Sequence, residues 1–237
     1  MILLSFNMDN FSFDSFDDFF QDDSDAIKWS ERDWAKYVKK SDSEIGRFAS
    51  LYSLNRPYGK TLDEIAQAAG WSIENYANPE VESFYTSYSA SSSVDDEEDE
   101  DGADFSYEPW TLLNHPVFII TKALFKCLDE HMGRLLIEVN SSSAQTWAVA
   151  KSISEASNFL SLAVNSTDLG EDTLARCHYK MGAASLNRLL AKVDSISVPE
   201  SQDGKERLAR VRNIVFDLRQ LCLNLAEQSA SAGGKNS

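Results

Sequence analysis

The chain has 237 residues, of which 43% are hydrophobic, and it carries a formal net charge of −16. This acidic excess disfavours nucleic acid as a partner, because phosphate binding depends on clustered Lys and Arg. Nothing in the sequence approaches the roughly 20 consecutive apolar residues of a membrane span. The opening Met-Ile-Leu-Leu is too short for a signal peptide, and three widely spaced cysteines do not make a disulfide framework. We therefore expect a soluble, cytoplasmic protein that does not bind membranes.

The charges are segregated along the chain. Residues 1–110 hold 25 of the 38 acids and 8 of the 22 basic residues, whereas residues 111–237 hold the other 13 acids and 14 basic residues. The first part thus has a net charge of −17 and the second a net charge of +1. Such an asymmetry predicts acidic segments attached to a folded body.

The first 25 residues form an acidic arm that is rich in phenylalanine and contains no Lys or Arg. Two interpretations are open. The arm is either a solvated tail whose rings dock on the protein's own body, or a recognition segment that folds against a protein partner with its rings as anchors. The second interpretation makes five rings candidate partner-binding residues, namely Phe11, Phe13, Phe16, Phe19 and Phe20.

Residues 26–88 predict a small helical region. Thr61 and Glu64 have the spacing of a capping box at the start of a short helix. The segment 61–72 is similar to the first helix and turn of a helix-turn-helix unit, which would imply DNA binding by the helix that follows. That following segment contains Pro79 and three acids but no cation. A helical hairpin used for packing or partner contact is therefore favoured.

Residues 89–106 are rich in Ser and then in acids, and this composition predicts a disordered linker. The segment 97–108 can be aligned with an EF-hand calcium loop, with Gly102 at the sixth position and Glu108 at the twelfth. It departs from that pattern at the first position, where Glu97 stands in place of Asp. We interpret the run as a solvated linker, and the sequence leaves calcium binding open.

Residues 107–228 predict four helices with apolar residues at helical spacing. Three cover about 115–139, 144–164 and 171–195. The fourth carries a heptad seam, made of Leu208, Val211, Val215, Leu218, Cys222 and Leu225. Helices of this length joined by short loops pack as antiparallel neighbours. The sequence thus predicts an all-α protein: a C-terminal up-down-up-down four-helix bundle, a smaller N-terminal helical region, an acidic disordered linker, and a disordered tail over residues 229–237.

Cysteine and histidine side chains on three of these helices raise the question of a zinc site, and they are Cys127, His131, Cys177, His178 and Cys222. At a rise of about 1.5 Å per residue the five groups fall at different levels along the bundle, so we interpret them as packing residues. Paired Glu-x-x-His motifs, nucleotide-binding loops and nucleophile motifs do not occur. We expect no metal, no cofactor and no enzymatic activity.

These features favour a non-catalytic protein that acts in protein–protein interaction or assembly, as an adaptor that uses the bundle surface and the acidic aromatic arm. One alternative is a helical bundle that binds a small ligand or a metal between its helices. A second alternative is an acidic nucleic-acid mimic that binds a basic partner, which would require the acids to be held in a rigid array.

Overall fold

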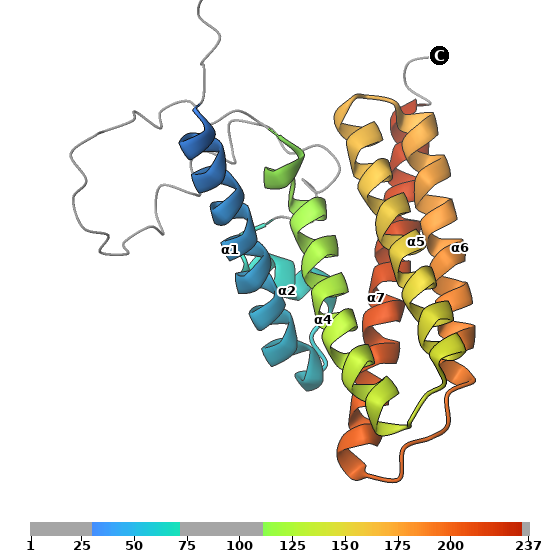
Figure 1. Ribbon diagram of the computed structural model, residues 1–237. Helices are drawn as coiled ribbons and strands as arrows, with labels where there is room; N and C mark the ends of the chain where they lie inside the picture. The colour runs from blue at the N-terminus through green and yellow to red at the C-terminus, as the bar shows by residue number, and fades with distance from the viewer. Residues whose placement is uncertain (1–29, 72–110, 234–237) are drawn as a thin grey trace, which may run out of the picture. The chain divides into compact units, whose positions relative to one another are not determined.

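The computed structural model describes residues 30–71 and 111–233, with side chains as far as residue 230. Within these two stretches every regular element is a helix (Figure 1). In chain order they are α1 (Glu31–Asn55), η3 (Arg56–Tyr58), α2 (Leu62–Ala68), η5 (Leu112–Asn114), α4 (Pro116–Glu138), α5 (Ser143–Asp168), α6 (Asp172–Asp194) and α7 (Gln202–Gly233). The predicted all-α class is confirmed. The acidic arm and the acidic linker lie outside the described residues.

The chain divides into two compact units, which are Met1–Tyr37 and Val38–Ser237. In the first unit the rings of Trp34 and Tyr37 meet edge to face, with 5.9 Å between their centroids. The second unit holds the bundle, α2 and the greater part of α1.

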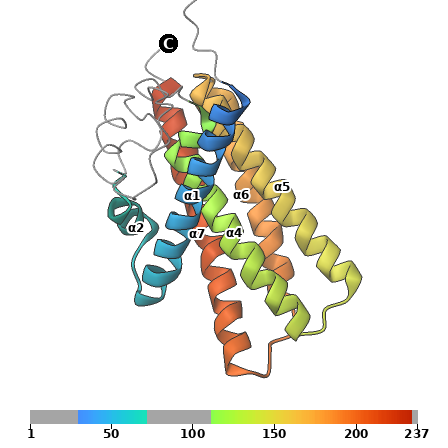
Figure 2. The same cartoon turned by 60° about the vertical axis from the view of Figure 1, so that its left-hand side comes forward.

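Helices α4, α5, α6 and α7 form the predicted four-helix bundle. Each helix contacts the next, and α7 returns to contact α4, which closes the ring. Figures 1 and 2 show the four helices side by side in two views. Helix α5 runs past residue 164 to Asp168, and α7 runs to Gly233. The last helix therefore extends into the segment 229–237, for which the sequence predicts a disordered tail.

Local side-chain chemistry explains where the helices begin. Thr61 and Glu64 form the predicted capping box of α2, with each side chain bonded to the other's backbone N–H. Ser142 and Gln145 form a second capping box at the start of α5. Helix α4 begins after His115, whose Nδ1 accepts a hydrogen bond from the Val117 N–H at 3.2 Å. These caps satisfy backbone donors that have no partner inside the helix.

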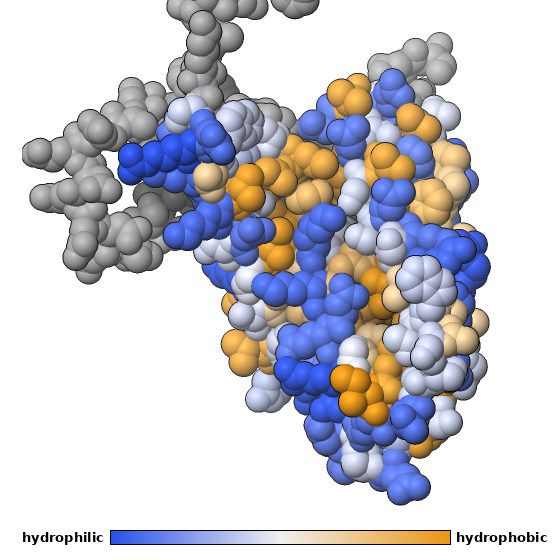
Figure 3. Space-filling view, in the orientation of Figure 1, coloured by the Kyte–Doolittle hydropathy of each residue, from blue (hydrophilic) through white to orange (hydrophobic). Residues whose placement is uncertain are grey.

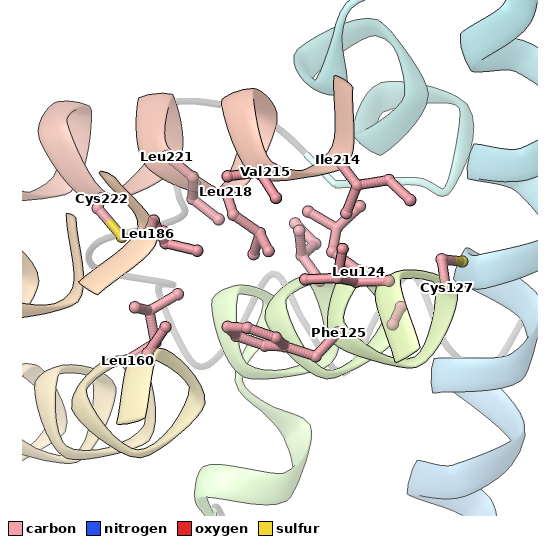
Figure 4. Close-up of a cluster of buried hydrophobic side chains, with 14 of the residues drawn as sticks. Leu124, Phe125, Cys127, Leu160, Leu186, Ile214, Val215, Leu218, Leu221 and Cys222 are labelled. Atoms are coloured by element: carbon pink, nitrogen blue, oxygen red, sulfur yellow. The ribbon is translucent and has the colours of Figure 1, made fainter. Parts of the chain in front are cut away.

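The centre of the bundle is filled by apolar side chains. All six residues of the predicted heptad seam on α7 are buried, and Leu218 has no exposed surface. In Figure 4 the seam meets Leu124 from α4, Leu160 from α5 and Leu186 from α6. Burial of this kind is the dominant favourable contribution to folding.

The bundle is asymmetric because the residues at its helix contacts differ in size. Ala156 and Ala163 on α5 and Gly182 on α6 are buried and small. A Cβ atom built on Gly182 would collide with the Leu160 side chain, so this position requires glycine at the observed spacing. Phe125 instead points from α4 towards α5 (Figure 4). Helices α5 and α6 consequently approach each other closely, whereas a groove separates α4 from α5.

Residues from α1 and α2 share the hydrophobic core of the bundle. Phe48, Tyr52 and Ile65 belong to the same cluster of buried side chains as the bundle residues. Ser41 Oγ donates a hydrogen bond to the Leu113 carbonyl oxygen at 2.9 Å. The sequence leaves open whether the N-terminal helical region packs on the bundle, and these contacts answer that question for the described part of the region from Ser41 onward.

The seam of α7 generates a stability prediction. Replacing Leu218 with Ala leaves a cavity among the four helices, and we expect the free energy of unfolding to fall by about 2–5 kcal/mol. Leu174→Ala is the matched control, because Leu174 is 44% exposed on α6. Chemical denaturation of both variants measures the difference. Equal losses for the two variants would contradict the central position of Leu218.

His115 generates a prediction for pH. Its side chain is 2% exposed, and burial lowers the pKa of the imidazole to about 4, against the opposing attraction of Asp168. Between pH 6.5 and 4 the unfolded chain therefore binds a proton at this position while the folded chain does not, so stability falls as the pH falls. The full loss is about 3 kcal/mol.

The control for this prediction is His115→Asn, which keeps a side-chain acceptor at the start of α4 but does not titrate. We expect the free energy of unfolding to decline more steeply from pH 6.5 to 4.5 for the wild-type chain than for the variant. Parallel declines would show that folding does not hold the imidazole neutral.

Candidate functional site

A pocket of about 270 Å³ lies where the end of α1 and η3 meet α4 and α7. Apolar and polar side chains from three walls line it: one wall comes from α1 and η3, one from α4 and one from α7. Pockets that bind small molecules are typically concave, mostly apolar and supplied with a few convergent polar groups. This pocket is therefore the first candidate site in the described part of the chain.

The wall from α1 and η3 is held by an ionic network. The Tyr52 hydroxyl donates to Asp217 Oδ2 at 2.6 Å, and Arg56 Nε donates to the same oxygen at 2.7 Å. Arg56 Nη2 donates to the other carboxylate oxygen at 3.0 Å. Burial, together with the nearby carboxylate, raises the pKa of Tyr52 far above its usual range, so the phenol stays protonated. The network connects α1 to α7 and neutralises the charge of Arg56.

The wall from α4 consists of Cys127 and His131, which lie four residues apart on one side of the helix. Figure 4 shows Cys127 pointing out of the bundle core towards α1. Its Sγ lies 3.8 Å from the Ala49 carbonyl oxygen and 3.7 Å from Ser53 Oγ, and burial raises the pKa of the thiol. His131 is half-buried, and burial followed by repulsion from Arg210 lowers its pKa. The imidazole is thus neutral at pH 7.

The wall from α7 consists of Arg210, Asn213 and Ile214. Among the described residues, Glu206 is the acid that pairs with Arg210, and the two charged groups are 3.9 Å apart. Glu130, at the edge of the pocket, forms its ion pair with Arg134 at 2.7 Å. The positive charge of Arg210 is therefore the least compensated charge at the pocket.

A second hollow is the groove between α4 and α5, with a volume of about 480 Å³. Lys122, Phe125 and Asp129 line its α4 side, and Ser157 and Ser161 line its α5 side. Partial burial raises the pKa of Asp129. The groove is more open than the first pocket. On the side of the bundle seen in Figure 3, hydrophobic areas are interspersed with hydrophilic ones.

The outer side of α6 and α7 forms a third feature, which we call the α6–α7 face and define by Asn187, Asp194, Arg212, Phe216, Arg219 and Leu223. Arg212 pairs with Asp194 at 2.8 Å, and Arg219 donates to Asn187 Oδ1 at 2.8 Å. Phe216 lies four residues after Arg212 and three before Arg219, so it occupies the same side of α7. Its side chain is 49% exposed. The face thus presents an aromatic ring between two guanidinium groups.

One serine and lysine pair on α5 and α6 resembles a catalytic dyad in composition. Lys192 Nζ donates to Ser152 Oγ and, at 2.8 Å, to the Ala148 carbonyl oxygen. The Ser152 side chain is buried and donates to the same carbonyl oxygen. A substrate cannot reach this hydroxyl, so the pair acts as a polar connection between α5 and α6.

The structure separates the cysteines and histidines that the sequence analysis weighs as metal ligands. Cys222 lies in the bundle core, Cys177 is exposed, and His178 Nδ1 lies 3.3 Å from Ser166 Oγ. Only Cys127 and His131 share a site. In the described ranges no group of three His, Cys, Asp or Glu side chains is placed to hold a metal ion.

The five candidate phenylalanines of the arm, Phe11, Phe13, Phe16, Phe19 and Phe20, lie outside the described residues. Sequence reasoning missed Tyr52, Arg56 and Arg210 as site residues. Arg56 and its partner Asp217 are 161 residues apart in the chain. The sequence offered only one local signal, namely that Tyr52 and Arg56 are four residues apart and so lie on one side of the chain as it leaves α1.

Comparison with known proteins finds no match, since no protein-family model, no curated protein and no solved structure is detectably similar to this chain. Among the described helices, none combines the length and apolar character needed to cross a membrane. The function must therefore be inferred from the geometry of the described residues.

The ionic network of the pocket generates a prediction for stability. Asp217→Asn leaves the partly buried Arg56 without its counter-ion, and we expect a loss of about 1–3 kcal/mol in the free energy of unfolding. Asp203→Asn is the control, because Asp203 also pairs with an arginine but is 73% exposed, and such pairs contribute about 0–1 kcal/mol. Tyr52→Phe should cost less in the Asp217→Asn background than alone. Additive losses would show that the three groups do not act together.

Proposed function

We propose that this chain is a non-catalytic protein-interaction or assembly protein, an adaptor, and that its α6–α7 face binds a partner segment with an acidic and an apolar side chain next to each other. The observation that carries the proposal is the half-exposed ring of Phe216 between Arg212 and Arg219. Aromatic residues and arginine are the residue types that contribute most to binding at protein interfaces.

The charges of the α6–α7 face determine what kind of partner fits. Asp194 compensates Arg212, whereas Arg219 has only the neutral amide of Asn187 as its hydrogen-bond partner in the described face. A carboxylate from a partner would complete this arrangement and form a charge-assisted hydrogen bond with Arg219. The exposed ring beside it offers apolar contact. Complementary charge also increases the rate of encounter and suppresses binding of basic partners.

The filled interior of the bundle supports this function over a ligand or metal held between the four helices. Large side chains with almost no exposed surface occupy the centre, among them Leu124, Leu160, Leu186 and Leu218. A ligand at that place would have to displace them at a cost of several kcal/mol, since interiors are close-packed. The pocket between α1, α4 and α7 lies at the edge of the bundle, so this argument about the bundle interior does not apply to it.

The acidic arm is the second contact of the proposed adaptor, with its five phenylalanines as anchors. This part of the proposal rests on the sequence, as does the alternative of an acidic nucleic-acid mimic, because the relevant acids lie outside the described residues. A cytoplasmic location belongs to the same proposal, and it is supported by the free thiols of Cys127, Cys177 and Cys222.

A photo-crosslinking amino acid at position 216 in the full chain tests the proposal. We expect it to give one dominant crosslinked protein in cells, and the crosslinked peptide to carry acidic and apolar residues. Phe216→Ser and Arg219→Glu should each lower recovery of that protein at least tenfold while the melting temperature stays nearly unchanged. Leu174→Ser is the control, because Leu174 is similarly exposed on another side of α6.

Two results would overturn the proposed face. One is equal recovery of the partner by Phe216→Ser and the wild-type chain. The other is a loss of melting temperature on Phe216→Ser as large as that on Leu218→Ala, which would place the ring in the protein's own core. Replacing Phe11, Phe13, Phe16 and Phe19 together with Ser tests the arm separately by the same recovery measurement.

A further inference from the structure

The pocket between α1, α4 and α7 has the dimensions of a site for a small molecule. Its volume of about 270 Å³ lies just below the range of roughly 300–1,000 Å³ that drug-sized ligands occupy. A compound with a single ring or a short alkyl chain matches this volume better than a nucleotide or a large cofactor does. The size of the pocket therefore limits its ligand to a compact molecule.

The apolar part of the pocket is formed by side chains that are fixed by other contacts. Ile214 and Cys127 are buried and belong to the hydrophobic cluster. The ring of Tyr52 is held by its hydrogen bond to Asp217. These groups offer a preorganised apolar wall, which reduces the ordering cost of binding.

The polar part of the pocket has unused hydrogen-bonding capacity. Neither the imidazole of His131 nor the amide of Asn213 makes a hydrogen bond to another side chain or carbonyl in the described chain, and neither does the guanidinium of Arg210. An ion pair of 3.9 Å to Glu206 is the nearest charged contact of Arg210. By contrast, the donors of Arg56 are directed at Asp217. The available donors thus gather around Arg210 and Asn213.

The electrostatics of the pocket favour an anion. The charge of Arg56 is compensated by Asp217, and Glu130 is compensated by Arg134. Arg210 is half exposed beside the apolar wall and has only the longer ion pair with Glu206, so its guanidinium can form a bidentate, charge-assisted contact with a carboxylate. A ligand that satisfies both walls has an anionic end and an apolar body.

We propose that this pocket binds a small carboxylate with an apolar body, such as an aryl acid or a short alkyl acid, with the carboxylate at Arg210 and Asn213 and the body against Tyr52 and Ile214. The site is independent of the proposed adaptor function, because Arg210 and Arg212 occupy opposite sides of α7. Binding would add a ligand-dependent connection between α1 and the bundle.

His131 gives a second readout of the site. Burial and then repulsion from Arg210 lower the pKa of its imidazole in the empty pocket. A bound carboxylate would offset that repulsion and raise the pKa towards or above the ordinary value. The other charged groups around the ring come from α4, α7 and η3, and they are Glu130, Arg134, Arg207 and Arg56.

Nuclear magnetic resonance titration of the full chain with phenylacetate and, separately, with butyrate tests the proposal. We expect saturable shifts of the Ser53, Asn213 and Ile214 signals and an increase in the pKa of His131. Phenylacetamide has the same shape without the charge, and inorganic phosphate has the charge without the apolar body. Each should bind at least tenfold more weakly than phenylacetate.

Paired variants locate the site. Arg210→Gln should weaken phenylacetate binding at least tenfold, and Asn213→Asp should do the same by placing an anion in the pocket. Arg212→Gln is the matched control on the same helix and should leave binding unchanged. Circular dichroism checks that all three variants are folded, and Asn213→Asp replaces an exposed side chain of equal size.

Four outcomes would overturn the proposal. They are the absence of saturable shifts with both carboxylates, binding of phenylacetamide as tight as that of phenylacetate, equal shifts with inorganic phosphate, and an effect of Arg212→Gln as large as that of Arg210→Gln. The last two would mean that anions are attracted to α7 in general rather than bound in this pocket.

Discussion

Burial of the heptad seam of α7 is the constraint on which the other features depend. The seam fixes the rotation of α7 about its axis, because Val211, Leu218 and Leu225 must all face the core. Successive residues of a helix are rotated by about 100° about its axis, so the direction of every other side chain on α7 follows from its distance in sequence to the seam. Arg210, Asn213 and Asp217 face the end of α1, while Arg212 and Arg219 face α6. A single helix therefore supplies one side of the pocket and the larger part of the α6–α7 face.

The second constraint is the difference in size between the helix contacts. Glycine and alanine bring α5 and α6 together, so their shared surface is closed and tied by the Lys192 contacts. Phenylalanine at position 125 holds α4 away from α5 and leaves the groove. Helix α4 is in turn covered on its outer side by α1, through Cys127 and the Phe48 cluster. The pocket exists because α1 covers α4 and α7 incompletely at its C-terminal end.

Much of the fold could be predicted from the sequence, because helices and their starts depend on local patterns. The spacing of the α7 seam, the capping box at Thr61 and the proline in the first turn of α4 are readable within a few residues. The docking of α1 could not be predicted in this way. It rests on burial of Phe48 and Tyr52 in the shared core and on contacts such as that of Arg56 with Asp217, and a local pattern does not identify the partner of either kind of contact.

The candidate sites were harder to predict for the same reason. Cys127 and His131 lie four residues apart on α4, and both line the pocket. Their environment depends on α1 and α7, so the lowered pKa of His131 follows from burial and from Arg210 rather than from any local motif. The sequence does not distinguish Phe216 as a binding residue, because single aromatic residues are common on protein surfaces. Its exposure in the structure distinguishes Phe216 from the buried seam residue Val215 next to it.

The net charge of −16 does not decide what either site binds, because electrostatic interactions in salt solution are local. At physiological ionic strength the screening length is about 8 Å, so acids further away hardly affect the potential at a given guanidinium. What matters at each site is the nearest acid. For Arg56 and Arg212 that acid is in direct contact, at 2.7 Å and 2.8 Å. Arg210 has a longer ion pair, at 3.9 Å, with Glu206. In the described residues the hydrogen-bond partner of Arg219 is the neutral amide of Asn187. An acidic protein can therefore carry two places that favour anions, and these places lie on different sides of one helix, where each can be changed without changing the other.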